Sequence, residues 1–201
     1  MIIELVGPPG SGKSTLARTL EETTPYKKVR VSSKHELLWL NIIFFFKYPL
    51  FCIKTLFLVT KHSSSVSMFY YKFMNIYLHH NARYEKAKKL DKTIIDEGLT
   101  HNVLGIFDEQ TEEKSIYSYI KSIPPSDHVL IINTPKETIK KQLEERGHMP
   151  RETFYTKERW EKWLDNTIKN TNTLEEVLEK QNIPHSNARD KNLDEIKSLL
   201  L

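Results

Sequence analysis

The sequence is poor in cysteine, since Cys52 is the only one among its 201 residues. A single cysteine excludes an internal disulfide and is typical of proteins from reducing compartments. An apolar segment begins at residue 2, so we expect no signal peptide. Together these features predict a cytoplasmic protein.

Several functional motifs are also lacking. The eight histidines are not arranged as H-E-x-x-H, and no paired C-x-x-C occurs, so a zinc site is not expected. The nucleophile elbow G-x-S-x-G of serine hydrolases is missing. The N-K-x-D element that a guanine-reading GTPase needs is missing too. Zinc enzymes, serine hydrolases and GTPase switches are therefore disfavoured.

The sequence has no strong excess of one charge sign. Its 30 Lys and Arg residues and 26 Asp and Glu residues give a net charge of +4, which suits small anionic substrates such as nucleotides. This charge is too low for a dedicated nucleic-acid binder, so we expect no specific nucleic-acid partner. Internal repeats and Gly/Ser linkers are absent from the sequence, and its length fits one domain over residues 1–201.

No apolar run is pure enough to indicate a clear membrane span. The most apolar part, residues 37–59, reaches the ~20 residues that a spanning helix needs. However, Asn41, Lys47 and Lys54 interrupt this part, and Pro49 divides it in two. We expect two packed helices here, with peripheral membrane contact or a homodimer face through residues 37–59 as the alternative.

The most informative feature present is a complete G-x-x-x-x-G-K-S phosphate loop. It consists of Gly7, Pro8, Pro9, Gly10, Ser11, Gly12, Lys13 and Ser14, and Thr15 follows in the next helix. The apolar segment 2–6 predicts a buried strand, so the loop joins a strand to a helix N-terminus, whose free N–H groups bind polyphosphate. Lys13 is expected to reach the β- and γ-phosphates of ATP, and Ser14 is expected to bind Mg²⁺.

Another apolar strand is predicted at residues 92–96. It ends in Asp96 and is followed by Glu97. A strand that ends in a carboxylate downstream of a phosphate loop is typical of a Walker B element. We expect Asp96 to hold Mg²⁺ directly or through water, and Glu97 to be a catalytic carboxylate. The alternative is a strand end with two solvated acids.

Two arginines flank a turn that contains glycine and proline. Arg146 and Arg151 fall in residues 146–157, which we expect to form a lid, because guanidinium groups bind phosphate oxygens and keep their charge. Both arginines would then neutralise charge that develops during phosphoryl transfer. The alternative is a solvated helix end.

A helix predicted over residues 66–90 carries many aromatic and polar side chains. They are Tyr70, Tyr71, Tyr77, His79, His80, Asn81 and Arg83. We expect the aromatic residues to pack and the polar ones to be solvated, with a substrate pocket as the alternative. A second strand predicted over residues 26–32 leads into Ser33 and Lys34, which we expect near the acceptor, since ligands bind at the carboxyl ends of parallel strands.

The order of these elements resembles the nucleoside and nucleotide kinases of the P-loop class, and most closely the thymidylate kinase-like and deoxynucleoside kinase-like branch. The resemblance implies an α/β fold in three layers, α/β/α, with a five-stranded parallel sheet of order 2-3-1-4-5. It implies a helical insertion at residues 34–90 that binds the acceptor, and ATP with Mg²⁺. It also implies that the loop near Asn187, Ala188 and Arg189 lies beside the adenine.

The sequence departs from both branches in one respect each. Thymidylate kinases carry Asp-Arg after the third strand, where this chain has Asp96 and Glu97. Deoxynucleoside kinases place a catalytic acid after the second strand, where this chain has residues 32–34, Ser-Ser-Lys. We therefore expect a P-loop kinase in which Glu97 deprotonates the hydroxyl of a nucleoside, sugar or similar molecule. The alternatives are a thymidylate-like nucleoside monophosphate kinase and a membrane-associated P-loop NTPase.

Overall fold

The computed structural model describes residues 1–147, 149–188 and 193–200. Its centre is a sheet of five parallel strands in the order β2-β3-β1-β4-β5. The strands are β1 (Ile2–Val6), β2 (Lys27–Lys28), β3 (Thr93–Asp96), β4 (His128–Ile131) and β5 (His185–Asn187). The α/β fold with sheet order 2-3-1-4-5, which the family resemblance implied, is confirmed.

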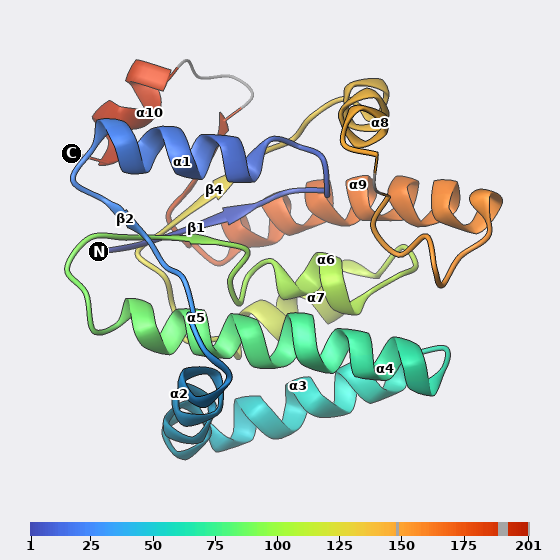
Figure 1. Cartoon of the computed structure of the whole chain (residues 1–201), viewed down its shortest axis with the longest axis horizontal. Coiled ribbons are helices and arrows are strands. Elements are labelled where there is room, and N and C mark those ends of the chain that lie inside the picture. Colours follow the sequence, from blue (N-terminus) through green and yellow to red (C-terminus); the bar gives the residue numbers. More distant parts are fainter. Residues whose placement is uncertain (148, 189–192, 201) are drawn as a thin grey trace.

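The central strand β1 divides its side chains between two cores, because successive residues of a strand point to opposite faces. Ile3 and Leu5 pack with α1 (Lys13–Thr23) and α10 (Leu193–Leu200) on one face. Ile2 and Val6 belong to a larger core on the other face. Figure 1 shows helices on both sides of the sheet, so the predicted three layers are present.

The helices beneath the sheet in Figure 1 form the larger core and the walls of the site. They are α5 (His79–Ala87), α6 (Asn102–Ile106), α7 (Glu113–Ile120) and α9 (Lys157–Lys180). Helix α8 (Lys136–Glu145) follows β4 and packs on α9 through Ile139 and Leu143. The chain therefore returns to the phosphate loop at the end of α8.

Two apolar helices form a further layer below α5, α2 (Lys34–Lys47) and α3 (Pro49–Lys61). Pro49 opens α3, a position where its missing N–H leaves no helical hydrogen bond unmade. The two axes differ by 115°. Over the described residues, no single helix has the length and apolar composition to cross a bilayer, and only this bent pair meets both criteria when taken together. Two separate helices thus occur where two were predicted.

The helix predicted over residues 66–90 is present but irregular. It begins as α4 (Val66–Lys72), whose N-cap Ser65 accepts a hydrogen bond from the Met68 N–H. It continues through a π-helical segment, η1 (Phe73–Leu78), into α5. A π turn holds more residues than an α turn and is frequent at functional sites.

The second strand is shorter than predicted, because its chain soon leaves the sheet edge. The Val29 N–H still donates to the Ile94 carbonyl, after which no further β2–β3 pairing is assigned between the described residues. Ser33 is the N-cap of α2 and accepts from the Glu36 N–H, while Ser32 donates to the Glu36 carboxylate. These serines therefore cap α2, the cavities at Glu97 are lined by other residues, and the serines' place at the acceptor site stays a prediction.

A buried carboxylate on β1 supports the turn that follows β3. Glu4 is fully buried and accepts hydrogen bonds from the Leu99 N–H at 3.2 Å and the Thr100 N–H at 2.8 Å. Burial raises the pKa of the Glu4 carboxyl, although these hydrogen bonds oppose the shift. Gly98 leaves the space that this side chain needs, since a methyl group there would lie 2.6 Å from the Glu4 carboxyl carbon.

We expect Gly98→Ala to destabilise the protein by about 1–3 kcal/mol, the usual cost of overpacking a filled core. Urea unfolding would show a lower midpoint with an unchanged slope. In a Glu4→Ala background the same substitution should cost much less, since the clashing atoms are gone. An equal cost in both backgrounds would show that the contact with Glu4 is not the cause.

Candidate active site

The phosphate loop has the geometry that its glycines predict. Gly12 precedes α1 with φ of 92°, a left-handed conformation that glycine adopts without steric cost. A methyl group on Gly7 would lie 2.4 Å from the Ile132 carbonyl oxygen, so the loop passes too close to β4 for any side chain. The loop therefore ends with N–H groups free to face a ligand at the start of α1.

Lys13, the first residue of α1, is held beneath the loop. Its Nζ donates to the Gly7 carbonyl at 2.8 Å and to the Pro8 carbonyl at 2.9 Å. Burial lowers the pKa of Lys13, and the charges of Glu97 and Asp96 oppose that shift. The ammonium group therefore lies inside the ring of loop atoms and 3.7 Å from Glu97.

Asp96 lies beside the loop because β3 pairs in parallel with β1, which places Asp96 opposite Leu5. Its Oδ2 accepts from the Ser14 hydroxyl at 2.8 Å and from Lys28 Nζ at 2.7 Å. Its Oδ1 is buried and has no hydrogen-bond partner among the described residues. An unpartnered carboxylate oxygen next to a hydroxyl fits Mg²⁺, which takes few protein oxygens and completes its shell with phosphate and water.

Over the described ranges, no cluster of three or more His, Cys, Asp and Glu side chains could hold a metal ion by itself.

Glu97 forms an unusual turn directly after β3. Its φ is 73°, in the left-handed region that residues with side chains seldom occupy. Arg83 on α5 stabilises this turn, because its guanidinium donates to the carbonyls of Asp96 at 2.9 Å and of Glu97 at 3.1 Å. Strain of this kind persists when its surroundings hold it, and it is concentrated at functional sites.

Three cationic or imidazole groups surround the Glu97 carboxylate. Lys13 Nζ lies 3.7 Å away, His101 Nε2 3.8 Å and Arg83 Nη1 4.0 Å. Loss of water contact raises the pKa of Glu97, but Lys13, His80 and Arg83 outweigh this effect and leave the pKa below its ordinary value. Glu97 is therefore ionised at neutral pH and can accept a proton.

The two histidines behind Glu97 are buried and uncharged at neutral pH. Burial, followed by the nearby charge of Arg83, lowers the pKa of His80 to about 4. Burial and the charge of Lys13 hold the pKa of His101 well below its ordinary value. His80 Nδ1 contacts the Asn102 side-chain oxygen, and His101 Nδ1 has no partner within the part of the chain that the structure describes.

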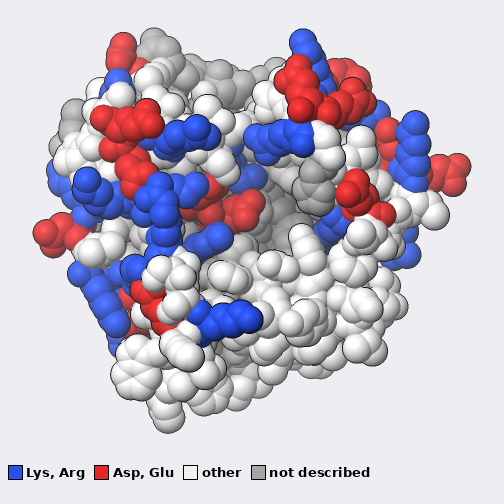
Figure 2. All heavy atoms as spheres, in the orientation of Figure 1, with Lys and Arg blue, Asp and Glu red and all other residues white. Residues whose placement is uncertain are grey.

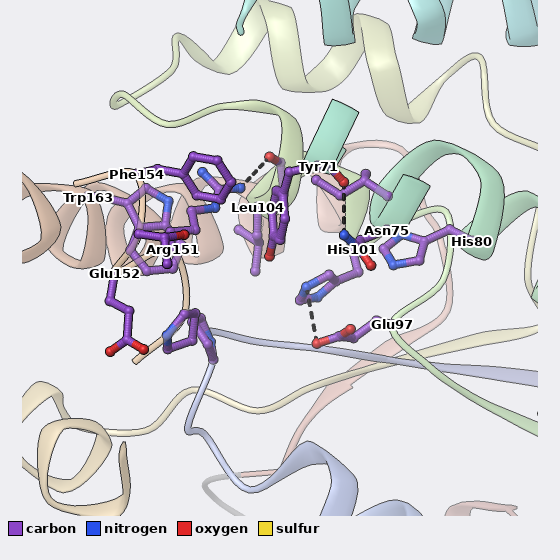
Figure 3. Close-up of a pocket in the computed structure, with 15 residues that line it drawn as sticks. Tyr71, Asn75, His80, Glu97, His101, Leu104, Arg151, Glu152, Phe154 and Trp163 are labelled. Carbon is purple, nitrogen blue, oxygen red and sulfur yellow. Dashed lines mark hydrogen bonds and ion pairs between the residues drawn. The ribbon is translucent and has the colours of Figure 1, made fainter. Parts of the chain in front are cut away.

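A cavity of about 540 Å³ extends from Glu97 between α4, α6 and the segment after α8. Figure 3 shows Glu97, His101 and His80 at one end and the rings of Tyr71, Phe154 and Trp163 with Arg151 at the other. The remaining lining residues are Pro9, Asn75, Ile76, Leu104, Gly105, Pro150, Glu152 and Thr153. The cavity therefore joins an ionised carboxylate to a largely aromatic wall, as a site for a small ring-bearing molecule would.

Arg151 is placed differently from the prediction for a phosphate-binding lid. Its buried guanidinium forms an ion pair with Asp108, donates to the Gly105 carbonyl at 2.7 Å and lies 4.8 Å from the centre of the Trp163 ring. Lys72 also pairs with Asp108, at 2.8 Å. Arg151 therefore belongs to the wall of the 540 Å³ cavity, because the ion pair with Asp108 holds its guanidinium there.

Arg146, at the end of α8, does face the phosphate loop. It lines a cavity of about 220 Å³ with Gly10, Gly12 and Lys13, and Glu97 lies at the edge of this cavity. It also lines a neighbouring cavity of about 610 Å³ with Thr15.

Part of the predicted adenine region can also be placed. Ala188 and Leu16 both pack against the core beneath α1. Arg189, the other residue predicted near the adenine, lies outside the described residues.

The prediction that the polar residues of 66–90 are solvated is wrong for His80, Asn81 and Arg83, and Asn81 is only 1% exposed. His80 lines the large cavity, and Arg83 contacts the turn at Glu97. The sequence signal available for His101 was only its position four residues after Glu97, and the turn between β3 and α6 brings the two side chains together. No comparable signal existed for Arg83, whose partners are fixed by the packing of α5 on β3.

We expect kcat/KM for phosphotransfer to show no titration of a histidine between about pH 6 and 8, where an ordinary histidine loses its proton. His80 and His101 remain neutral across this range, and the lowered pKa of Glu97 moves its loss of basicity to more acidic solution. A profile of log kcat/KM against pH would test this. An inflection near pH ~6.5 that disappears in His101→Gln would contradict the assignment of a neutral histidine.

The family comparison agrees with this geometry. A family model described as an AAA domain matches residues 2–168. The chain belongs to the AAA domain family. The matched part of this AAA domain includes the phosphate loop, Asp96, Glu97, Arg146 and Arg151.

Solved structures similar to this AAA domain include three with small bound molecules. Deoxyadenosine kinase from M. mycoides with products dCMP and a flexible dCDP is 16% identical, covers 99% of this chain and 96% of its own, and has a TM-score of 0.49. The YorR protein from Bacillus subtilis in complex with phosphorylated GDP is 19% identical, with coverages of 98% and 92% and a TM-score of 0.45. Shikimate kinase from Acinetobacter baumannii with shikimate is 17% identical, with coverages of 88% and 79% and a TM-score of 0.41.

A search of curated proteins gave no match. The likeness to these solved structures does not identify the substrate of this AAA domain.

Proposed function

We propose that this protein is a phosphotransferase that moves the γ-phosphate of ATP, with Mg²⁺, to a hydroxyl of a small molecule. The observation that carries the proposal is the position of Glu97. It lines three cavities. They are the one at the phosphate loop, the 540 Å³ cavity toward Arg151 and a third between β2 and α5. An ionised carboxylate at the junction of a phosphate site and a second pocket is suited to activate an acceptor.

On the donor side, the loop N–H groups and Lys13 would bind the phosphates, and Arg146 would approach them from the end of α8. Ser14 and Asp96 would hold Mg²⁺, which neutralises charge on the phosphate oxygens when bound. Glu97 would take the proton of the acceptor hydroxyl. The hydroxyl oxygen would then bond to the γ-phosphorus while the bond to the β-phosphate oxygen breaks, which leaves ADP.

A second candidate, a nucleoside monophosphate kinase, is favoured by one observation. The third cavity, of about 340 Å³, is lined by the basic residues Lys28, Arg30 and Arg83 close to Asp96. Lys28 already pairs with Asp96, and Arg30 pairs with Glu21 at 2.5 Å. Arg83 makes its contacts with Asp96 and Glu97 through Nη1, so Nη2 of its guanidinium would be the donor that meets a phosphate on the acceptor.

An acceptor screen with γ-labelled ATP separates the two candidates. The purified chain would be incubated with nucleosides, nucleoside monophosphates, sugars and lipid head groups, with Lys13→Ala as the matched blank. Label transferred to an uncharged hydroxyl compound is the expected result. Label transferred best to a monophosphate would favour the second candidate, and label released only as inorganic phosphate would contradict both.

A further inference from the structure

Helices α2 and α3 present an unusual number of large apolar side chains to solvent. Phe46 and Leu50, beside the bend, are 79% and 82% exposed. The others on these two helices are Leu38, Trp39, Ile42, Phe45, Ile53, Leu56 and Phe57. We call these nine residues the apolar face. A contiguous face of this kind commonly marks an interaction site.

The two carboxylates nearest the apolar face in the sequence are both paired, Glu36 with Lys86 at 2.6 Å and Glu85 with Lys47 at 2.5 Å. The sequence has no Asp or Glu between Glu36 and Glu85. Exposed lysines stand at the two outer ends of the helix pair, Lys34 at the start of α2 and Lys61 at the end of α3. Figure 2 shows the contrast, since its lower right part, over α3 and α4, is uncharged, whereas Lys, Arg, Asp and Glu crowd its upper half.

We propose that the apolar face docks on the surface of a bilayer that contains anionic lipids. Aromatic and aliphatic side chains enter the boundary between headgroups and acyl chains, and flanking lysines are attracted to anionic headgroups. The bend of 115° between the helices and the lysines at both outer ends fit a pair that lies on the surface rather than spanning it.

A second copy of the chain fits this face less well. Twofold pairing would bring the same lysines of both copies together. Residues 37–84 offer no carboxylate to meet them, and Glu36 at the start of α2 already pairs with Lys86, so the contact would be repulsive as well as apolar. A bilayer with anionic headgroups supplies the missing negative charge.

Docking in this way leaves the phosphate loop accessible. Figure 1 shows α2 and α3 on the far side of α5 from the sheet, while the loop lies between β1 and α1. Membrane binding is therefore independent of phosphotransfer, and each can be tested without the other.

Co-sedimentation of the full chain with vesicles tests the proposal. We expect binding to vesicles in which about a third of the phosphatidylcholine is replaced by phosphatidylglycerol, and weaker binding at high salt. Phe46→Ser combined with Phe57→Ser should weaken binding about 10-fold or more, since each aromatic side chain loses its buried apolar area. Leu90→Ser is the matched control, because Leu90 is exposed but lies outside the apolar face.

Tryptophan fluorescence gives a second readout that does not depend on sedimentation. Trp39 is 61% exposed, whereas Trp160 and Trp163 are each 4% exposed. Vesicles should therefore shift the emission of the wild-type chain to shorter wavelength, and Trp39→Phe should abolish the shift while sedimentation remains.

Three results would overturn the proposal. They are equal binding to vesicles of phosphatidylcholine alone, an unchanged affinity of the double serine variant, and a vesicle-free dimer that this variant dissociates. The last result would assign the apolar face to a second copy.

Discussion

Lys13→Ala is expected to lower the rate of phosphotransfer by at least about 10²- to 10³-fold, the usual effect of removing one group that stabilises charge in a transition state. Lys13 Nζ already lies among the loop carbonyls and 3.7 Å from Glu97. The fold should survive, because alanine has the highest helix propensity and Lys13 opens α1.

Single-turnover transfer from γ-labelled ATP and circular dichroism would be measured together on this variant. Lys27→Ala is the control, since Lys27 is an exposed lysine on β2. Transfer that persists in a natively folded Lys13→Ala protein would place the phosphates elsewhere. Loss of the native spectrum would instead indicate a structural role for the hydrogen bonds to Gly7 and Pro8.

Glu97→Gln should leave binding of ATP with Mg²⁺ unchanged and slow transfer to a hydroxyl by about 10²-fold or more, as expected for loss of a general base. Glutamine keeps the size of the side chain but cannot accept the proton. Asp96→Asn provides the contrast, because it should weaken the dependence on Mg²⁺ and reduce every turnover, including slow ATP hydrolysis.

The control for the change of charge is Glu112→Gln, at an exposed carboxylate on the protein surface. An acceptor that already carries a phosphate needs little deprotonation, so its phosphorylation should be affected much less. If Glu97→Gln transferred phosphate to a hydroxyl at nearly the wild-type rate, Glu97 would not be the general base. It would then be a solvated acid at the end of the strand. That result would favour the monophosphate kinase.

Local patterns predicted the phosphate loop and the end of β3. The spacing of Gly7, Gly12 and Lys13 is constrained by the backbone conformation of the loop. The spacing alone therefore predicts the loop structure. Asp96 could be placed because a parallel sheet brings the carboxyl ends of its strands to one edge. The order of the strands was implied by family resemblance, and the structure shows the same order.

The direction of individual side chains could not be predicted in the same way. Arg151 follows a turn, and only tertiary packing brings Asp108, a residue 43 positions away, next to its guanidinium. Arg83 reaches the turn at Glu97 across a helix–strand contact. Ser32 and Ser33 stand at the expected strand end, but local hydrogen bonds with Glu36 draw them into a helix cap.

The π-helical segment η1 forms part of the wall of the 540 Å³ cavity beside Glu97. Tyr71 and His80 lie on opposite sides of it, and both line that cavity. The wide turn accommodates an extra residue, so the phase of the helix after η1 depends on how many residues η1 contains. Loss or gain of one residue within Phe73–Leu78 would rotate Tyr71 relative to His80 and Arg83 unless the turn changed type to compensate. The shape of this cavity can thus be altered by the number of residues in η1 as well as by the side chains that line it.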